Sequence, residues 1–172
     1  MTTNSPASPL EVEYIDVVDS DDKVIGVMPK THAIASNQTC RVVFVLLIND
    51  DRKVFLQQRK STKKSLPLYW SGSAAGHVRA GESYIDAANR ELYEELGVSA
   101  ELQLTEKFYS AEYNEMVSVF IAKHNGPFTL EEAAIETASF YTYESLQSPS
   151  PEMKISSYLG RVIPVLKTLL NK

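Results

Sequence analysis

Short apolar runs alternate with turn residues over most of the chain, which is typical of β-strands joined by tight turns. Residues 41–48 are apolar at every position after Arg41, which predicts a central strand buried on both faces. Residues 11–18 and 23–28 flank an acidic turn and predict a hairpin that ends at Pro29. Further strands are expected at residues 54–59, 101–110, 116–122 and 139–143.

Residues 83–96 have the spacing of an amphipathic helix, with Ile85, Ala88, Leu92 and Leu96 predicted on one face. Ser83 followed by Asp86 resembles a capping box at its start, and Gly97 suits the left-handed position that ends a helix. A second helix is expected at residues 157–171, perturbed near Pro164, and residues 31–36 predict a short helix or a loop. Strands mixed with two substantial helices predict one α/β or α+β sandwich.

The length of 172 residues favours a single domain, which we expect at residues 10–172 after a flexible tail at residues 1–9. A hydrophobic fraction of 44% and a charged fraction of 23% are ordinary for a globular protein. The net charge of −5 disfavours binding to a nucleic acid polymer, which usually needs a basic face. It is compatible with a small anionic substrate, because a metal ion can bridge an acidic site to a phosphate.

The N-terminus lacks the basic start and apolar stretch of a signal peptide. The longest apolar run, residues 42–48, is far shorter than the roughly 20 residues that span a bilayer. Cys40 is the only cysteine, so an intrachain disulfide is excluded, and we expect this thiol to be a small buried hydrophobe. These features predict a soluble, cytoplasmic protein without a membrane partner.

The first predicted helix carries three glutamates on one side. At about 100° per residue, Glu91, Glu94 and Glu95 fall within roughly 100° of arc, at the edge of the apolar face. Like charges at this spacing disfavour a helix by roughly 0.2–0.5 kcal/mol per pair. A bound divalent cation such as Mg²⁺ or Mn²⁺ would make this arrangement of glutamates favourable instead, because such a cation prefers oxygen ligands. The alternative is a solvated acidic face.

The surroundings of this face favour the metal hypothesis. Glu82 lies just before the helix, and Arg90 lies inside the acidic cluster. Gly76 and Gly81 bracket a loop that can bring backbone carbonyls close to the same place.

Residues 76–98 (GHVRAGESYIDAANRELYEELGV) resemble the Nudix box, in which a glycine, a glutamate, an Arg-Glu pair, a Glu-Glu pair and a final glycine stand at fixed spacing. The matching positions are Gly76, Glu82, Arg90, Glu91, Leu92, Glu94, Glu95, Gly97 and Val98.

The resemblance implies an α/β fold, a Nudix-type α/β/α sandwich with a mixed sheet and a loop–helix–loop metal site. It implies that Glu91, Glu94, Glu95 and the Gly76 carbonyl bind Mg²⁺ or Mn²⁺. Arg90 would then orient the carboxylates, and Glu82 would act outside the ligand shell.

The implied reaction is hydrolysis of the pyrophosphate bond in a nucleoside diphosphate linked to another group. Glu94 and Glu95 are expected to be ligands rather than the general base, which varies in this family and can lie outside the box. A homodimer is a further expectation from the resemblance.

Residues 54–82 are also similar to isopentenyl diphosphate isomerase, a Nudix-fold enzyme that has a catalytic cysteine where this chain has Ala75. The isomerase's upstream histidine pair is incomplete here, with His32 as one match and Cys40 in the region of the other. The box is intact in this chain and degraded in the isomerases, which favours a hydrolase with isomerase-like flanks. His77 then becomes a candidate metal or phosphate contact, with a structural role as the alternative.

A third hypothesis is a non-catalytic module that senses a nucleotide. It is disfavoured because all the box acids are present.

Outside the box, Arg59 ends a predicted strand and is the first candidate for phosphate contact, ahead of Lys63. The alternative is a solvated loop, which also holds Lys60 and Lys64. Five later acids are candidates for a further metal ligand or the general base, and three aromatic residues are candidates for stacking on a nucleobase or for core packing. The acids are Glu112, Glu115, Glu131, Glu132 and Glu136, and the aromatic residues are Phe44, Tyr69 and Trp70.

Overall fold

The computed structural model describes residues 12–170, so the tail predicted at residues 1–9 lies outside the described residues. Nine strands form one mixed sheet in this part of the chain. The elements are β1 (Tyr14–Val18), β2 (Val24–Pro29), α1 (Lys30–Ala35), β3 (Cys40–Ile48), β4 (Val54–Arg59), β5 (Trp70–Ser71), β6 (Ala74–His77), α2 (Tyr84–Leu96), β7 (Gln103–Ser110), β8 (Glu115–Lys123), β9 (Ile135–Tyr141), α3 (Tyr143–Gln147) and α4 (Ser157–Leu170).

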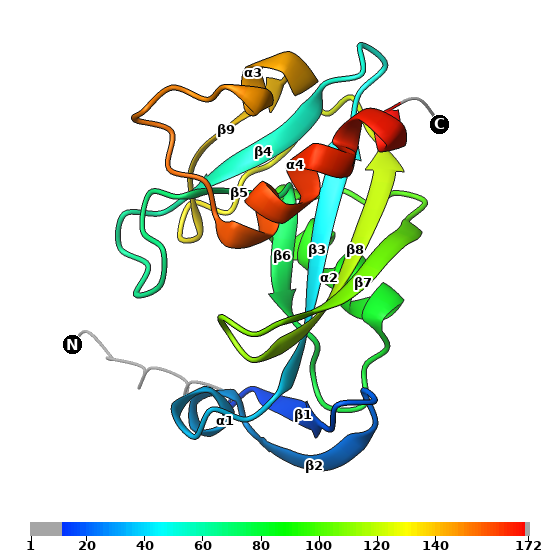
Figure 1. Cartoon of the computed structure of the whole chain (residues 1–172), viewed down its shortest axis with the longest axis vertical. Helices are drawn as coiled ribbons and strands as arrows, with labels where there is room; N and C mark the ends of the chain where they lie inside the picture. Colours follow the sequence, from blue (N-terminus) through cyan, green and yellow to red (C-terminus); the bar gives the residue numbers. More distant parts are fainter. Residues whose placement is uncertain (1–11, 171–172) are drawn as a thin grey trace, which may run out of the picture.

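Strand β3 is the centre of the sheet, as its continuous apolar run predicts. It pairs in parallel with β8 along its whole length and antiparallel with β6, β4 and β1. Val43, Val45 and Leu47 pack in one cluster with the buried face of α2, whereas Phe44 and Leu46 pack in the other cluster with α4. Figure 1 shows the two helices on opposite faces of the sheet. The predicted α/β/α sandwich with a mixed sheet is confirmed.

Helix α2 begins and ends where the sequence signals predict. The Ser83 hydroxyl accepts a hydrogen bond from the Asp86 amide at 3.2 Å, and Gly97 has φ 67°, in the left-handed region. The prediction that Ile85 lies on the buried face is wrong, because Ile85 is 39% exposed, whereas Ala87 is fully buried. At about 100° per residue, the buried arc is thus turned by roughly 50° toward the glutamates.

The C-terminal third differs from prediction in its boundaries. Strand β9 begins at Ile135, earlier than the expected residue 139, and pairs with β4. Thr142 caps the short helix α3, which the apolar pattern did not predict. Helix α4 is present and contains Pro164. No helix within residues 12–170 is long and apolar enough to cross a membrane.

The N-terminal hairpin of β1 and β2 lies at one end of the sheet. Its two strands pair antiparallel, and β1 reaches β3 through the pairing of Val17 with Cys40. Residues 31–36 fall within or beside the short helix α1, which follows β2 directly. Figure 1 shows this hairpin and α1 below the main body of the sheet.

Candidate functional site

A cleft of about 520 Å³ opens beside α2 and β6. It collects side chains from the N-terminal segment, the ends of several strands and the start of α4. Both charge signs are present on its lining. The charged residues are Glu13, Lys30, Arg59, Lys63, Arg79, Arg90, Glu91, Glu94, Glu95, Glu115 and Glu131.

Glu91, Glu94 and Glu95 of α2 form what we call the acidic wall of the cleft. The helix comes so close to β6 that a Cβ atom built on Gly76 would lie 2.1 Å from Glu91 Oε1. Real atoms do not approach so closely, so this position requires glycine as long as the Glu91 carboxylate stays in place. The contact also places the backbone of Gly76 next to that carboxylate.

Arg90 links the acidic wall to the loop before the helix. Its guanidinium donates to both carboxylate oxygens of Glu82, at 2.8 and 2.9 Å. It also donates to Glu91 at 2.6 Å, to Glu94 at 3.2 Å and to the His77 carbonyl at 3.0 Å. The hydrogen bond to Glu82 is the largest cause of the raised pKa of Arg90. Arg90 therefore stays charged and fixes the carboxylates around it.

Two carboxylates of the acidic wall bind protons more tightly than usual. Burial, and next the negative charge of Glu91, raise the pKa of Glu95 to about 8, although Gln57 donates a 2.7 Å hydrogen bond to it. Burial also raises the pKa of Glu91, against the lowering effect of Arg90. Crowded, partly buried carboxylates of this kind gain from a nearby cation, which favours their charged forms.

Within residues 12–170, no group of three or more His, Cys, Asp or Glu side chains is gathered closely enough to be a ready-made metal site. Arg90 bridges Glu91 and Glu94, and Glu95 turns toward Gln57 on β4. The donors nevertheless fit Mg²⁺ or Mn²⁺ in their chemistry, because they are carboxylate oxygens crowded against the backbone of Gly76.

Lys30, Arg59 and Lys63 line the same cleft, and we call these three residues its basic wall. The Lys30 ammonium lies 2.9 Å from Glu13 Oε2, and Arg59 Nε donates to the Ser65 carbonyl at 3.1 Å. Lys30 was not predicted from the sequence, since neither its spacing nor its neighbours mark it as a site residue.

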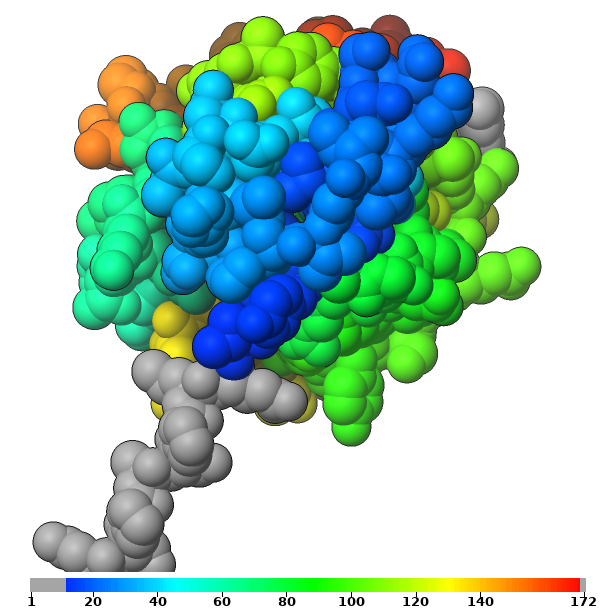
Figure 2. Space-filling view, turned by 90° about the horizontal axis from the view of Figure 1, so that it is seen from below, coloured from blue at the N-terminus to red at the C-terminus, as the bar shows by residue number. Residues whose placement is uncertain are grey.

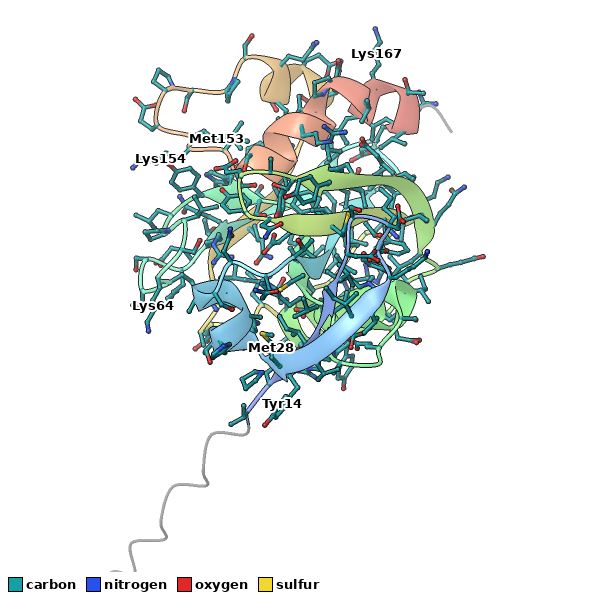
Figure 3. All side chains as sticks on the ribbon, turned by 60° about the horizontal axis from the view of Figure 1, so that its bottom comes forward. Tyr14, Met28, Lys64, Met153, Lys154 and Lys167 are labelled. Atoms are coloured by element: carbon teal, nitrogen blue, oxygen red, sulfur yellow. The ribbon has the colours of Figure 1, made fainter. Side chains whose placement is uncertain are left out.

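The other two lysines of the basic loop do not line the cleft. Lys60 lies 3.7 Å from Glu136, and Lys64 is exposed and points away from the body of the protein (Figure 3).

Glu115 and Glu131 are the two candidate late acids that line the cleft, whereas Glu112, Glu132 and Glu136 do not. Glu115 Oε1 lies 3.2 Å from His77 Nε2, and the Tyr158 hydroxyl donates to the other carboxylate oxygen. His77 Nε2 is buried, and within the described chain it has no aligned hydrogen-bond partner.

None of the three aromatic candidates for nucleobase stacking lines the cleft. Phe44 is fully buried in the core, and Trp70 packs edge-on against Tyr141 with ring centroids 5.0 Å apart. Tyr113 and Tyr158 line the cleft instead.

Of the residues singled out by the resemblance to the isomerase, some line the cleft and one does not. His32 is exposed on α1 and does not line the cleft, whereas Cys40 and Ala75 do. Cys40 is 2% exposed, which confirms that it is a buried small side chain. Burial, and next the charge of Glu115, raise the pKa of its thiol to about 11, so it stays protonated near neutral pH.

The chain resembles known proteins both in sequence and in fold. The model of the NUDIX domain matches residues 38–160. An uncharacterised Nudix hydrolase of Pseudomonas aeruginosa is 35% identical over 133 residues, which cover 76% of this chain and 79% of that protein. The crystal structure of DR0079 from Deinococcus radiodurans superposes with a TM-score of 0.76 at 22% identity, over 91% of this chain and 98% of that one.

A further relative is named as an isomerase and not as a hydrolase. The isopentenyl-diphosphate Delta-isomerase of Serratia proteamaculans is 38% identical over 96 residues, which cover 56% of this chain and 54% of the isomerase.

Proposed function

The chain belongs to the Nudix hydrolase family, and on that premise we propose that it uses Mg²⁺ or Mn²⁺ to cleave the pyrophosphate bond of a nucleoside diphosphate linked to another group. The family supports pyrophosphohydrolase activity in general. The metal requirement and the class of substrate are the parts that we propose.

The cleft that has both an acidic and a basic wall is the observation that carries this proposal. A diphosphate is a chain of anionic oxygens, so it needs positive charge on more than one side. Lys30, Arg59 and Lys63 supply that charge directly. The acidic wall of the same cleft repels phosphate unless a cation lies between them.

Glu91, Glu94, Glu95 and the Gly76 carbonyl would hold this cation. A bound divalent metal neutralises phosphoryl oxygens and lowers the pKa of a bound water. Arg90 keeps the Glu91 and Glu94 carboxylates in place, and Glu82 in turn fixes Arg90 through two hydrogen bonds. Glu95 has a pKa of about 8, so it would release a proton when a cation binds.

Several other residues of the cleft have proposed roles with the substrate. Arg59 and Lys63 were expected to contact phosphate, and Lys30 joins them because it lines the same wall. His77 is a further candidate for phosphate contact, beside Glu115. Glu115 and Glu131 line the cleft outside the acidic wall, which makes them candidates for the proton acceptor.

The test is a panel of nucleotide sugars, dinucleotides, coenzyme A and nucleoside diphosphates, assayed with Mg²⁺ and with Mn²⁺ for release of phosphate or mononucleotide. Glu94→Gln should lower kcat by about 100-fold or more, since the loss of even an outer partner of a metal site costs 10–100-fold. Glu132→Gln is the matched control, because Glu132 is exposed and does not line the cleft. The proposal fails if the wild type turns over no substrate with either metal, or if Glu94→Gln turns over the substrate as fast as the wild type. Tight nucleotide binding without turnover would support a sensing module instead.

A second candidate function is the isomerisation of isopentenyl diphosphate, favoured by the 38% identity to the isomerase over 96 residues. Ala75 stands where that isomerase resemblance places a catalytic cysteine, and alanine cannot transfer a proton. Incubation with isopentenyl diphosphate in deuterated water distinguishes the two functions. Deuterium incorporation would support the isomerase, whereas our proposal predicts none.

Three expectations stay predictions: a single domain over residues 10–172, a cytoplasmic location and a homodimer. Light scattering of the purified chain tests the last of these directly.

A further inference from the structure

The N-terminal hairpin of β1 and β2 lies before residue 38, where the match to the NUDIX domain begins. It nevertheless contacts the loop that leads into α2. Figure 2 shows the blue N-terminal segment directly against the green segment that contains this loop and helix. The hairpin is therefore placed to influence the acidic wall, although the family match does not include it.

Asp16 of β1 makes the side-chain contact between the hairpin and this loop. Its residue is 4% exposed, and its two carboxylate oxygens accept from the Gly81 amide at 3.2 and 3.3 Å. Arg41 Nη1 lies 3.6 Å from the same carboxylate and balances its charge. A buried carboxylate is costly unless it is paired, so these contacts fix its position.

Backbone contacts strengthen the same link. The Ala80 amide donates to the Tyr14 carbonyl at 2.9 Å, and Ile15 forms an isolated antiparallel bridge with Arg79. Gly81 has φ +75°, in the left-handed region that favours glycine. The hairpin thus holds three successive residues of the loop, from 79 to 81.

Two sets of contacts connect this loop to the acidic wall. The Arg79 amide donates to Glu82 at 2.9 Å, and Glu82 accepts both hydrogen bonds from Arg90, which in turn holds the glutamates of α2. The Arg79 side chain lies 3.2 Å from Glu94 and 3.8 Å from Glu13, just before β1.

We propose that Asp16 is a positioning residue for the metal site, acting through Gly81, Glu82 and Arg90 on the carboxylates of the acidic wall. The proposal rests on the proposed function, because it assumes that those carboxylates bind a divalent cation. Groups that support metal ligands from outside the ligand shell commonly change metal affinity when they are removed. What is new is that this support comes from a hairpin outside the matched domain.

Direct Mn²⁺ binding to the purified full chain, followed by electron paramagnetic resonance, provides the test. Asp16→Ala removes the acceptor for Gly81 and should weaken Mn²⁺ binding by about tenfold. Asp16→Asn keeps an oxygen that can accept from Gly81 and should restore most of the affinity. Asp19→Ala is the matched control, because Asp19 accepts from Asp21 and Lys23 within the β1–β2 turn and is not bonded to the loop.

The proposal is supported if the wild type binds Mn²⁺ and Asp16→Ala loses affinity for Mn²⁺ while Asp19→Ala does not. Equal affinities for wild type and Asp16→Ala, or an equal loss in Asp16→Ala and Asp19→Ala, overturn the proposal alone. Failure of the wild-type chain to bind Mn²⁺ overturns the proposed function together with this proposal.

If Asp16→Ala does not fold, hydrogen exchange of the backbone amides in the wild-type chain, measured with and without Mg²⁺, tests the proposal instead. Coupling between hairpin and metal is reciprocal, so Mg²⁺ should slow exchange of the Ala80 and Gly81 amides. The Lys23 amide in the β1–β2 turn should be unchanged. Unchanged exchange at Ala80 and Gly81 would overturn the proposal.

Discussion

The two walls of the cleft are assembled in different ways. The acidic wall comes from one turn of one helix, with its residues at most four positions apart, from Glu91 to Glu95. The basic wall comes from three places: Lys30 at the start of α1, Arg59 at the end of β4, and Lys63 in the loop that follows.

The difference has a consequence for function. A helix fixes the spacing of its side chains by its own hydrogen bonds, and Arg90 fixes them further, so the acidic wall is suited to a cation that demands defined geometry. The basic wall lies on strand ends, a short helix and a loop, which suits contact with phosphate groups of varied substrates. We therefore expect changes in the acidic wall to act mainly on kcat and changes in the basic wall mainly on KM.

After Glu94→Gln, the largest effect is expected from Arg90→Lys. A lysine cannot reproduce the two parallel hydrogen bonds to Glu82 together with those to Glu91 and Glu94. We expect kcat/KM to fall by about 100-fold, mostly through kcat. Steady-state kinetics at saturating metal measure this, with circular dichroism to show that the fold is retained. A change in KM alone would contradict the division between the walls.

Gly76→Ala should have the next largest effect. The new methyl group would meet the Glu91 carboxylate, which is the movable end of a side chain, so the fold should survive while the carboxylate shifts. We expect kcat to fall by about 30-fold, a loss within the range for disturbed metal sites. Gly26→Ala is the matched control, because a Cβ there has no atom within 4 Å. Equal activity of both variants would show that the close approach of α2 to β6 has no catalytic role.

Lys30→Met tests the basic wall. Loss of a charge-assisted contact to phosphate should raise KM by about tenfold and leave kcat within about twofold. Lys64→Met in the basic loop is the control, since Lys64 is exposed and does not line the cleft. If Lys30→Met lowers kcat and leaves KM unchanged, the basic wall has another role.

The smallest effect on catalysis is expected from Asp22→Asn, which acts on stability. Burial alone would raise the pKa of Asp22, but hydrogen bonds from Lys107 and Arg41 outweigh it, and the pKa is lowered. A lowered carboxylate pKa stabilises the fold above the unfolded pKa, and the gain is lost as pH falls through the folded value.

The variant should therefore be less stable than wild type by about 1–3 kcal/mol near pH 7. The difference should shrink below the ordinary aspartate pKa of 3.8. Urea unfolding at a series of pH values measures this. If the difference in the free energy of unfolding between variant and wild type does not depend on pH, the effect comes from packing and not from charge.

Local signals in the sequence predict helix α2 almost completely. Ser83, Asp86 and Gly97 mark its ends, and each acts on backbone groups within a few residues. The central position of β3 was also predictable, because a strand buried on both faces needs apolar side chains at every position. Helix α3 and the true start of β9 were missed, because few of their residues are buried and they have no strong apolar period.

The sequence by itself determined the acidic helix face, because that face depends on spacing along a short segment, and its resemblance to the Nudix box supplied the α/β class and the glycine that faces the helix. Tertiary structure decided which basic residues join the cleft, that Gln57 donates to Glu95, and that the N-terminal hairpin holds Gly81. Those contacts join segments far apart in the chain. Their positions depend on how the sheet and helices pack, which no local pattern of residues specifies.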